Sequence, residues 1–164
     1  MDRVSRLFEN HHEALYRYLV RLSGDADVAA DVAQETFVRL FEQPPDARIE
    51  RAWLFKVGTN LVFERARTSA RRRRLLDATG ERTMADPPPD PHDAAVANDQ
   101  RRLLLAAVAT LSDKERTAVL MREEGFSHRE IADAVRTTTG SVGTLLARAL
   151  TRLARAIRVD QSAL

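Results

Sequence analysis

The chain has 164 residues, of which 44% are hydrophobic and 30% are charged, and its formal net charge is +2. It contains no cysteine, which excludes disulfides and thiolate metal sites, and no apolar run approaches the roughly 20 residues of a membrane span. The charged N-terminus is unlike a signal peptide, so we expect a soluble, cytoplasmic protein without membrane insertion. The six glycines and six prolines are few for a turn-rich sheet protein, and the composition predicts an all-α fold.

Three amphipathic helices are predicted in the first half, at about residues 5–22, 25–42 and 51–74. Gly24 ends the first, Asp25 caps the second, and the prolines of "QPPDA" end the second. Apolar residues at helical spacing predict a small bundle. The expected core residues are Leu7, Phe8, Leu15, Tyr16, Leu19, Leu22, Val28, Val32, Phe37, Leu40, Phe41, Trp53, Leu54, Val57, Leu61 and Val62.

An acidic, proline-rich segment then predicts a domain boundary. Residues 77–99 hold six acidic residues, one arginine and three consecutive prolines. Consecutive prolines favour extended backbone, which suits a flexible tether. We therefore predict two small helical domains, at residues 1–76 and 98–164, joined by an acidic linker at 77–97.

Four further helices are predicted in the second half. The first begins between residues 94 and 98, and two capping boxes, Ser112 with Glu115 and Ser127 with Glu130, start the next two. Thr138 is expected to cap the last helix, at about residues 139–158. The expected core residues are Leu104, Ala107, Val108, Leu111, Ala118, Val119, Leu120, Ile131, Ala132, Val135, Val142, Leu146, Ala149, Leu150 and Leu153.

The last two predicted helices have the outline of a DNA-reading helix-turn-helix over residues 127–155. Residues 136–158 carry five arginines and no acid. Arg148, Arg152 and Arg155 suit contacts to the DNA backbone, and short polar side chains lie toward the start of the second helix. The alternative is a plain helical hairpin with a solvated basic face. The short polar residues are Thr138, Thr139, Ser141 and Thr144.

A second candidate site is "RAWLFKVGTNLVFERARTSARRRR", residues 51–74, which interleaves aromatic and basic residues. Rings stack on unpaired bases, arginines hold phosphates, and Asn60 offers a donor and an acceptor to a base edge. The competing interpretation is that Trp53 and Phe55 are core residues and that the arginines form a solvated helix end.

A third candidate is "DVAQETFVRLFE", residues 31–42, in which four polar residues recur at helical spacing. Such a stripe is either a solvated face or a protein-docking surface. Enzyme chemistry is not expected, because the chain has no phosphate-binding loop or nucleophile elbow and its neighbouring histidines point to different helix faces. We predict no catalytic residue, metal site or cofactor.

Taken in order, the three motifs resemble those of an extracytoplasmic-function sigma factor of the sigma-70 family. "ADVAQETFVRLFE" resembles the region-two helix that docks on RNA polymerase, and "RAWLFKVGTNLVFERAR" resembles the helix that recognises the −10 promoter element. "LSDKERTAVLMREEGFSHREIADAVRTTTGSVGTLLARALTRL" resembles region four, which reads the −35 element. The resemblance implies core RNA polymerase and promoter DNA as partners, and an anti-sigma factor as an inhibitor.

The resemblance also implies roles for individual residues. Core-polymerase contacts are expected from Asp31, Gln34, Glu35 and Arg39. Contacts to −10 DNA are expected from Arg51, Trp53, Lys56, Asn60, Arg65 and Arg67. Contacts to −35 DNA are expected from Arg136, Thr138, Thr139, Ser141, Thr144, Arg148 and Arg152. A helix-turn-helix regulator or an interaction module without sigma activity is the alternative.

The chain departs from the family pattern at several positions. Of the usual D-A-E-D docking acids only Asp31 is present, and the turn has Arg136 in place of the usual glycine. Gly143 and Leu145 stand at two usually basic positions of the recognition helix. A glycine within a helix costs about 1 kcal/mol relative to alanine, and each lost phosphate contact weakens DNA binding.

Overall fold

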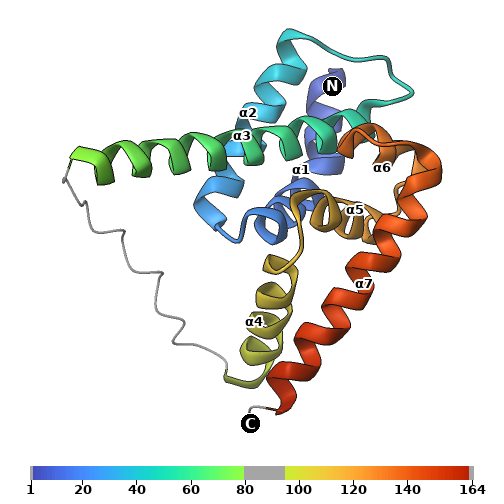
Figure 1. Cartoon of the computed structure of the whole chain (residues 1–164). Coiled ribbons are helices and arrows are strands. Elements are labelled where there is room, and N and C mark those ends of the chain that lie inside the picture. Colours follow the sequence, from blue (N-terminus) through green and yellow to red (C-terminus); the bar gives the residue numbers. More distant parts are fainter. Residues whose placement is uncertain (1, 80–94, 163–164) are drawn as a thin grey trace.

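The structure, a computed structural model, describes residues 2–79 and 95–162 (Figure 1). Over these two ranges the chain forms seven α-helices and no strand, which confirms the predicted all-α fold. The helices are α1 (Arg3–Ser23), α2 (Ala26–Glu42), α3 (Glu50–Thr79), α4 (Ala95–Ala109), α5 (Asp113–Glu123), α6 (His128–Val135) and α7 (Thr139–Ser162).

The predicted helix-ending and helix-starting residues are confirmed in the first half. Gly24 adopts a left-handed conformation, with φ of 71°, and its N–H donates to the Val20 carbonyl. The Asp25 carboxylate accepts hydrogen bonds from the N–H groups of Asp27 and Val28, which no carbonyl within α2 can satisfy. The turn between α1 and α2 is therefore specified locally.

Helices α1, α2 and α3 pack against one another as a bundle. Gly58 lies where α3 meets α1, and a Cβ atom there would come within 3.2 Å of Leu19 Cδ2. The missing side chain lets the two helices approach closely. Beside this contact the buried Tyr18 hydroxyl lies 2.7 Å from Thr59 Oγ1, and Thr59 in turn donates to the Phe55 carbonyl. Tyr18 is therefore the donor in its own bond to Thr59.

Helices α5, α6 and α7 form the second half, with α4 packed along α7. Both predicted capping boxes are present, at Ser112 with Glu115 and at Ser127 with Glu130. Arg136 ends α6 with φ of 57°, the left-handed conformation that glycine adopts most easily.

Helix α3 is longer than predicted. It continues to Thr79, so residues 77–79 of the predicted linker are helical, and α4 already begins at Ala95. Arginine, leucine and alanine fill the end of α3, and these residues favour helix. The rest of the predicted linker lies outside the described residues.

Four residues that we expected in the core are exposed. Phe8 is 45% exposed, Phe41 71%, Leu104 52% and Leu150 58%. Each helix is amphipathic over a wider face than its neighbours cover, so helical spacing alone overestimates the buried stripe. The other expected core residues are buried or half-buried.

Candidate nucleic-acid interface

The side of α3 that faces away from α1 and α2 carries a stripe of one aromatic and three polar residues. Trp53, Lys56, Asn60 and Arg67 recur at steps of three, four and seven residues, which places them on one face of the helix. The opposite face is buried against α1 and α2 and includes Leu54, Gly58, Leu61 and Val62. The structure thus brings together four of the six residues predicted to contact −10 DNA.

Phe55 does not belong to this stripe. Its ring is fully buried, with centroids 4.9 Å from those of both Tyr18 and Phe126. The competing interpretation is therefore correct for Phe55, which cannot stack on a base in this conformation. Trp53 and Phe63 are half-buried against the same core and keep part of each ring accessible.

Arg65 points to α2 instead. Its guanidinium lies 3.5 Å from Asp31 Oδ2 and donates to Glu35 Oε2 at 3.1 Å. Glu35 also accepts from Arg39 at 2.8 Å. The bond from Arg65 lowers the pKa of Glu35, partial burial opposes this shift, and Arg39 adds to the lowering. Asp31, Glu35 and Arg39, which are predicted to dock on polymerase, thus form one ion-pair network with Arg65, which is predicted to contact DNA.

Gln34, the fourth predicted docking residue, lies beside an apolar groove. The groove runs between α1 and α2 and is lined by Phe8, His12, Ala30, Gln34, Phe37, Val38 and Phe41. Val38 is 50% exposed, and Phe8 stacks on His12 with ring centroids 4.3 Å apart. Helical spacing predicts that Phe8 and Phe41 lie in the core, so the sequence does not reveal this surface.

The first turns of α7 are exposed. Thr138 and Ser141 share a hydrogen bond of 2.6 Å between their hydroxyls, and Thr139, Thr144 and Arg148 are open to solvent. Gly143 is also exposed, with nothing within 4 Å of the position a Cβ would take. Leu145 differs, because it is half-buried against the core. Its place in a usually basic position thus adds packing within this half.

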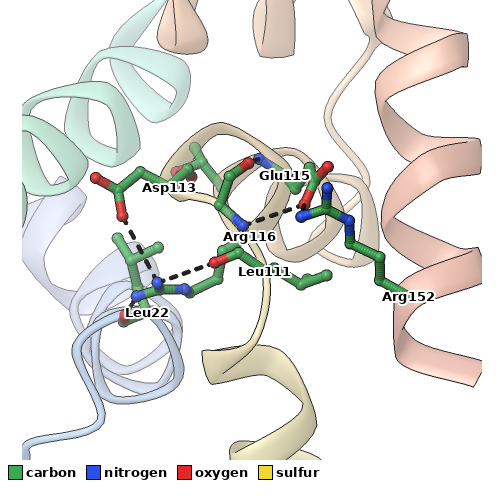
Figure 2. Close-up of polar contacts among 8 residues, drawn as sticks. Leu22, Leu111, Asp113, Glu115, Arg116 and Arg152 are labelled. Atoms are coloured by element: carbon green, nitrogen blue, oxygen red, sulfur yellow. Dashed lines mark hydrogen bonds and ion pairs between the residues drawn. The ribbon is translucent and has the colours of Figure 1, made fainter. Parts of the chain in front are cut away.

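Arg152 has a structural partner (Figure 2). Its Nη1 donates to Glu115 Oε2 at 3.2 Å, and the Glu115 side chain is only 5% exposed. The same carboxylate accepts the Ser112 N–H at 3.1 Å. The pair fastens α7 to the start of α5. The sequence predicts Glu115 only as part of a capping box. In the structure its carboxylate also pairs with Arg152.

A neighbouring arginine bridges the two halves (Figure 2). Arg116 donates to the Leu22 carbonyl at 3.0 Å and to the Leu111 carbonyl at 3.3 Å. Leu22 lies in the last turn of α1, where helix carbonyls have no partner within the helix. Asp113 lies 3.6 Å from the same guanidinium. The sequence does not reveal this bridge, because Leu22 lies 94 residues before Arg116.

The second half also covers part of the α3 polar face. Lys56 Nζ lies 2.9 Å from Asp133 Oδ2 on α6. Arg51 donates to the Glu124 carbonyl at 2.6 Å, and its guanidinium carbon lies 4.1 Å from the Phe126 ring centroid. Two predicted −10 residues are therefore held by the part of the chain that resembles region four.

A hollow of about 440 Å³ lies between the halves. Its lining includes Asn60 and Arg67 from α3 together with Lys114 of α5 and Arg136. Residues from both predicted DNA sites thus share one cleft, whose lining carries four cations and the two carboxylates of Glu64 and Asp113. Within the described residues no helix is long and apolar enough to cross a membrane.

Two family models match this chain. Residues 7–72 match Sigma-70 region 2, and residues 101–153 match Sigma-70, region 4. The first match covers most of α1, all of α2 and most of α3, and the second runs from α4 into α7. The molecule is a sigma-70-type protein with regions two and four in that order.

Curated relatives narrow the class. The chain is 37% identical over 147 residues to the ECF RNA polymerase sigma factor SigL of Mycobacterium tuberculosis. This alignment covers 85% of this chain and 80% of that protein. It is 30% identical over 165 residues to the ECF RNA polymerase sigma factor BldN of Streptomyces coelicolor, covering 97% of this chain and 62% of that protein. The chain belongs to the family of ECF RNA polymerase sigma factors.

A solved structure has the same fold. The sigma factor RpoE from Bartonella quintana, in complex with the anti-sigma factor NepR, aligns with a TM-score of 0.69 and 22% identity. The alignment covers 95% of this chain and 97% of that one. The all-α arrangement of two helical parts is therefore shared with a protein of low sequence identity.

Proposed function

We propose that this protein binds core RNA polymerase, directs it to specific promoters and promotes opening of their −10 region. The observation that carries the proposal is the ordered occurrence of regions two and four on one chain that is 37% identical to a sigma factor over most of its length. We place the working units at residues 1–76 and 98–164, as the sequence predicts.

Polymerase docks on α2 in this proposal. The exposed side of α2 offers Asp31, Glu35 and Arg39, and beside them lies the groove with exposed Phe8 and Phe41. Charged residues around apolar side chains are typical of a protein interface with an apolar centre and a polar rim. Arg65 pairs with the carboxylates of Asp31 and Glu35.

The two DNA contacts lie on different helices. Asn60 and the neighbouring cations of α3 receive unpaired −10 bases, and the exposed first turns of α7 enter the major groove at the −35 element. Arg148 follows the backbone there. Arg152 contributes mainly by holding α7 in place through Glu115, since that carboxylate already takes up its charge.

Binding of −10 DNA requires the halves to separate. Arg51 and Lys56 are occupied by Glu124, Phe126 and Asp133 as long as the halves are in contact. Engagement of polymerase and promoter replaces these contacts. An anti-sigma factor that stabilised the closed arrangement would keep the protein inactive, and RpoE is a sigma factor whose structure was solved in complex with an anti-sigma factor.

Run-off transcription with purified core polymerase and genomic promoter fragments tests the proposal. We expect promoter-specific transcripts with the protein and none without it. Asn60→Ala should reduce promoter opening while leaving core binding intact. Tight duplex binding without any transcript would instead favour a regulator without sigma activity, and absence of core binding would refute the proposal.

A further inference from the structure

The cleft between the halves has the size of a small-molecule site. Its volume of about 440 Å³ lies within the range of roughly 300–1,000 Å³ that such sites have, and they are common between domains. Asn60, Phe63 and Arg67 line it from α3, and Lys114 and Arg136 line it from the second half. A molecule that fills the cleft therefore contacts both halves at once.

The lining of the cleft carries positive charge without a partner. Among the described residues, Arg67, Lys114 and Arg136 form no ion pair, and all three are exposed. The lining has two carboxylates, and that of Asp113 already lies 3.6 Å from an arginine outside the cleft. Only Glu64 remains to offset the three cations, so the cleft favours an anionic ligand.

The cleft also offers groups that suit a nucleobase. Phe63 is half-buried and keeps part of its ring accessible, and aromatic rings stack on bases of any sequence. The half-buried carboxamide of Asn60 supplies a hydrogen-bond donor and an acceptor to a base edge. Arginine and lysine are the side chains that bind phosphate groups. A flat base joined to phosphates matches both parts of the lining.

We propose that this cleft binds a nucleotide, with its phosphates among Arg67, Lys114 and Arg136 and its base against Phe63 and Asn60. The observation that carries the proposal is a cationic cleft, lined by both halves, that also holds an aromatic ring and an amide. The site itself does not depend on the proposed function.

A regulatory consequence does rest on the proposed function. A nucleotide that contacts both halves binds only the closed arrangement, and binding therefore shifts the protein toward that arrangement. The nucleotide also occupies Asn60, which is proposed to receive unpaired −10 bases. Nucleotide binding thus opposes engagement of the −10 element.

Calorimetric titration of the full chain tests the site. The probes are ADP and GDP, with pyrophosphate and guanosine as the two parts of a nucleotide, all in 150 mM salt. We expect one site that binds ADP or GDP at least about fivefold more tightly than pyrophosphate, because a stacked base adds at least that affinity. Guanosine should bind at least about tenfold more weakly than GDP, because it lacks the phosphates. Equal affinities for pyrophosphate and both nucleotides would overturn the proposal, as would binding of neither nucleotide.

Variants on each side of the cleft test whether the nucleotide bridges the halves. Arg67→Ala on α3 and Lys114→Ala on α5 should each weaken nucleotide binding about tenfold, because each removes a charged hydrogen bond to phosphate. Arg129→Ala is the control, since this exposed arginine of α6 does not line the cleft and has no assigned role. Unchanged affinity for Lys114→Ala would overturn the proposal, and so would equal weakening by Arg129→Ala.

Competition with a labelled −10 strand tests the regulatory consequence. Saturating nucleotide should weaken strand binding by the free protein. The Lys114→Ala variant should escape this effect at the same nucleotide concentration, because Lys114 is not assigned to either DNA contact. Strand binding that nucleotide leaves unchanged would overturn the regulatory role. Nucleotide binding without promoter-specific transcription would instead count against the proposed function alone.

Discussion

At the residue scale, Arg136 has a left-handed backbone conformation in the turn of the helix-turn-helix. A side chain at φ of 57° is disfavoured by its Cβ, and no glycine is present to remove the cost. We expect Arg136→Gly to have a free energy of unfolding about 1 kcal/mol greater than Arg136→Ala. Both variants lack the arginine side chain, so comparing them by urea denaturation isolates the effect of the backbone conformation. Equal stabilities would show that this conformation has no cost.

Glu35 provides a pH dependence at the same scale. Its pKa is lowered from an ordinary value of 4.5, chiefly by the bond from Arg65. A lowered folded-state pKa adds stability above pH 4.5, and this addition is lost as the pH falls through the lowered value. Glu35→Gln should therefore be less stable than the unchanged protein at pH 7, and the gap should narrow toward pH 3.

Urea denaturation across this pH range measures the gap directly. Glu13→Gln is the control, because that side chain is 83% exposed. A gap for Glu35→Gln that stayed constant from pH 7 to pH 3 would show that the charge of Glu35 does not contribute.

At the scale of elements, α1 and α2 leave an apolar groove uncovered. Phe41 is 71% exposed, so Phe41→Ala should change the free energy of unfolding by less than about 0.5 kcal/mol. If polymerase docks there, the variant should bind core polymerase at least about fivefold more weakly, since aromatic side chains dominate interface energies. Leu75→Ala, at a side chain 64% exposed on α3, should leave core affinity unchanged.

Most of the helices could be predicted because their signals are local. Ser112, Ser127 and Asp25 cap helices through bonds to residues two or three positions away, and the sequence displays such spacings directly. The stripe of Lys56 and Asn60 follows from helical periodicity in the same way. The extent of the candidate sites was predictable only where they lie along a single helix.

The contacts between elements were not predictable in this way. No sequence pattern near Lys56 predicts its contact with Asp133, and none near Arg116 predicts its bond to the Leu22 carbonyl. These partners are set by how the helices pack in three dimensions. Periodicity also cannot say which part of an apolar face a neighbour covers, and for this reason Phe41 was wrongly assigned to the core.

At the scale of the whole molecule, the proposed function has contact between the halves compete with DNA for α3. Asp133→Asn removes the partner of Lys56 without altering any α3 side chain. We expect the free variant to bind a labelled −10 strand up to about fivefold more tightly, because an exposed ion pair contributes at most about 1 kcal/mol. Asp27→Asn, which removes a carboxylate from α2, is the matched control. Equal affinities for both variants would show that this ion pair does not limit access.

Phe126 is a fully buried residue of the second half, and its ring also contacts Phe55 and Arg51 of the first half. Unfolding either half would expose this ring and part of the other half's core. The free protein should therefore melt as one cooperative unit, with calorimetric and van't Hoff enthalpies in agreement, although its chain carries two functional regions. Each region then depends on the other for its resistance to heat as long as the halves stay in contact.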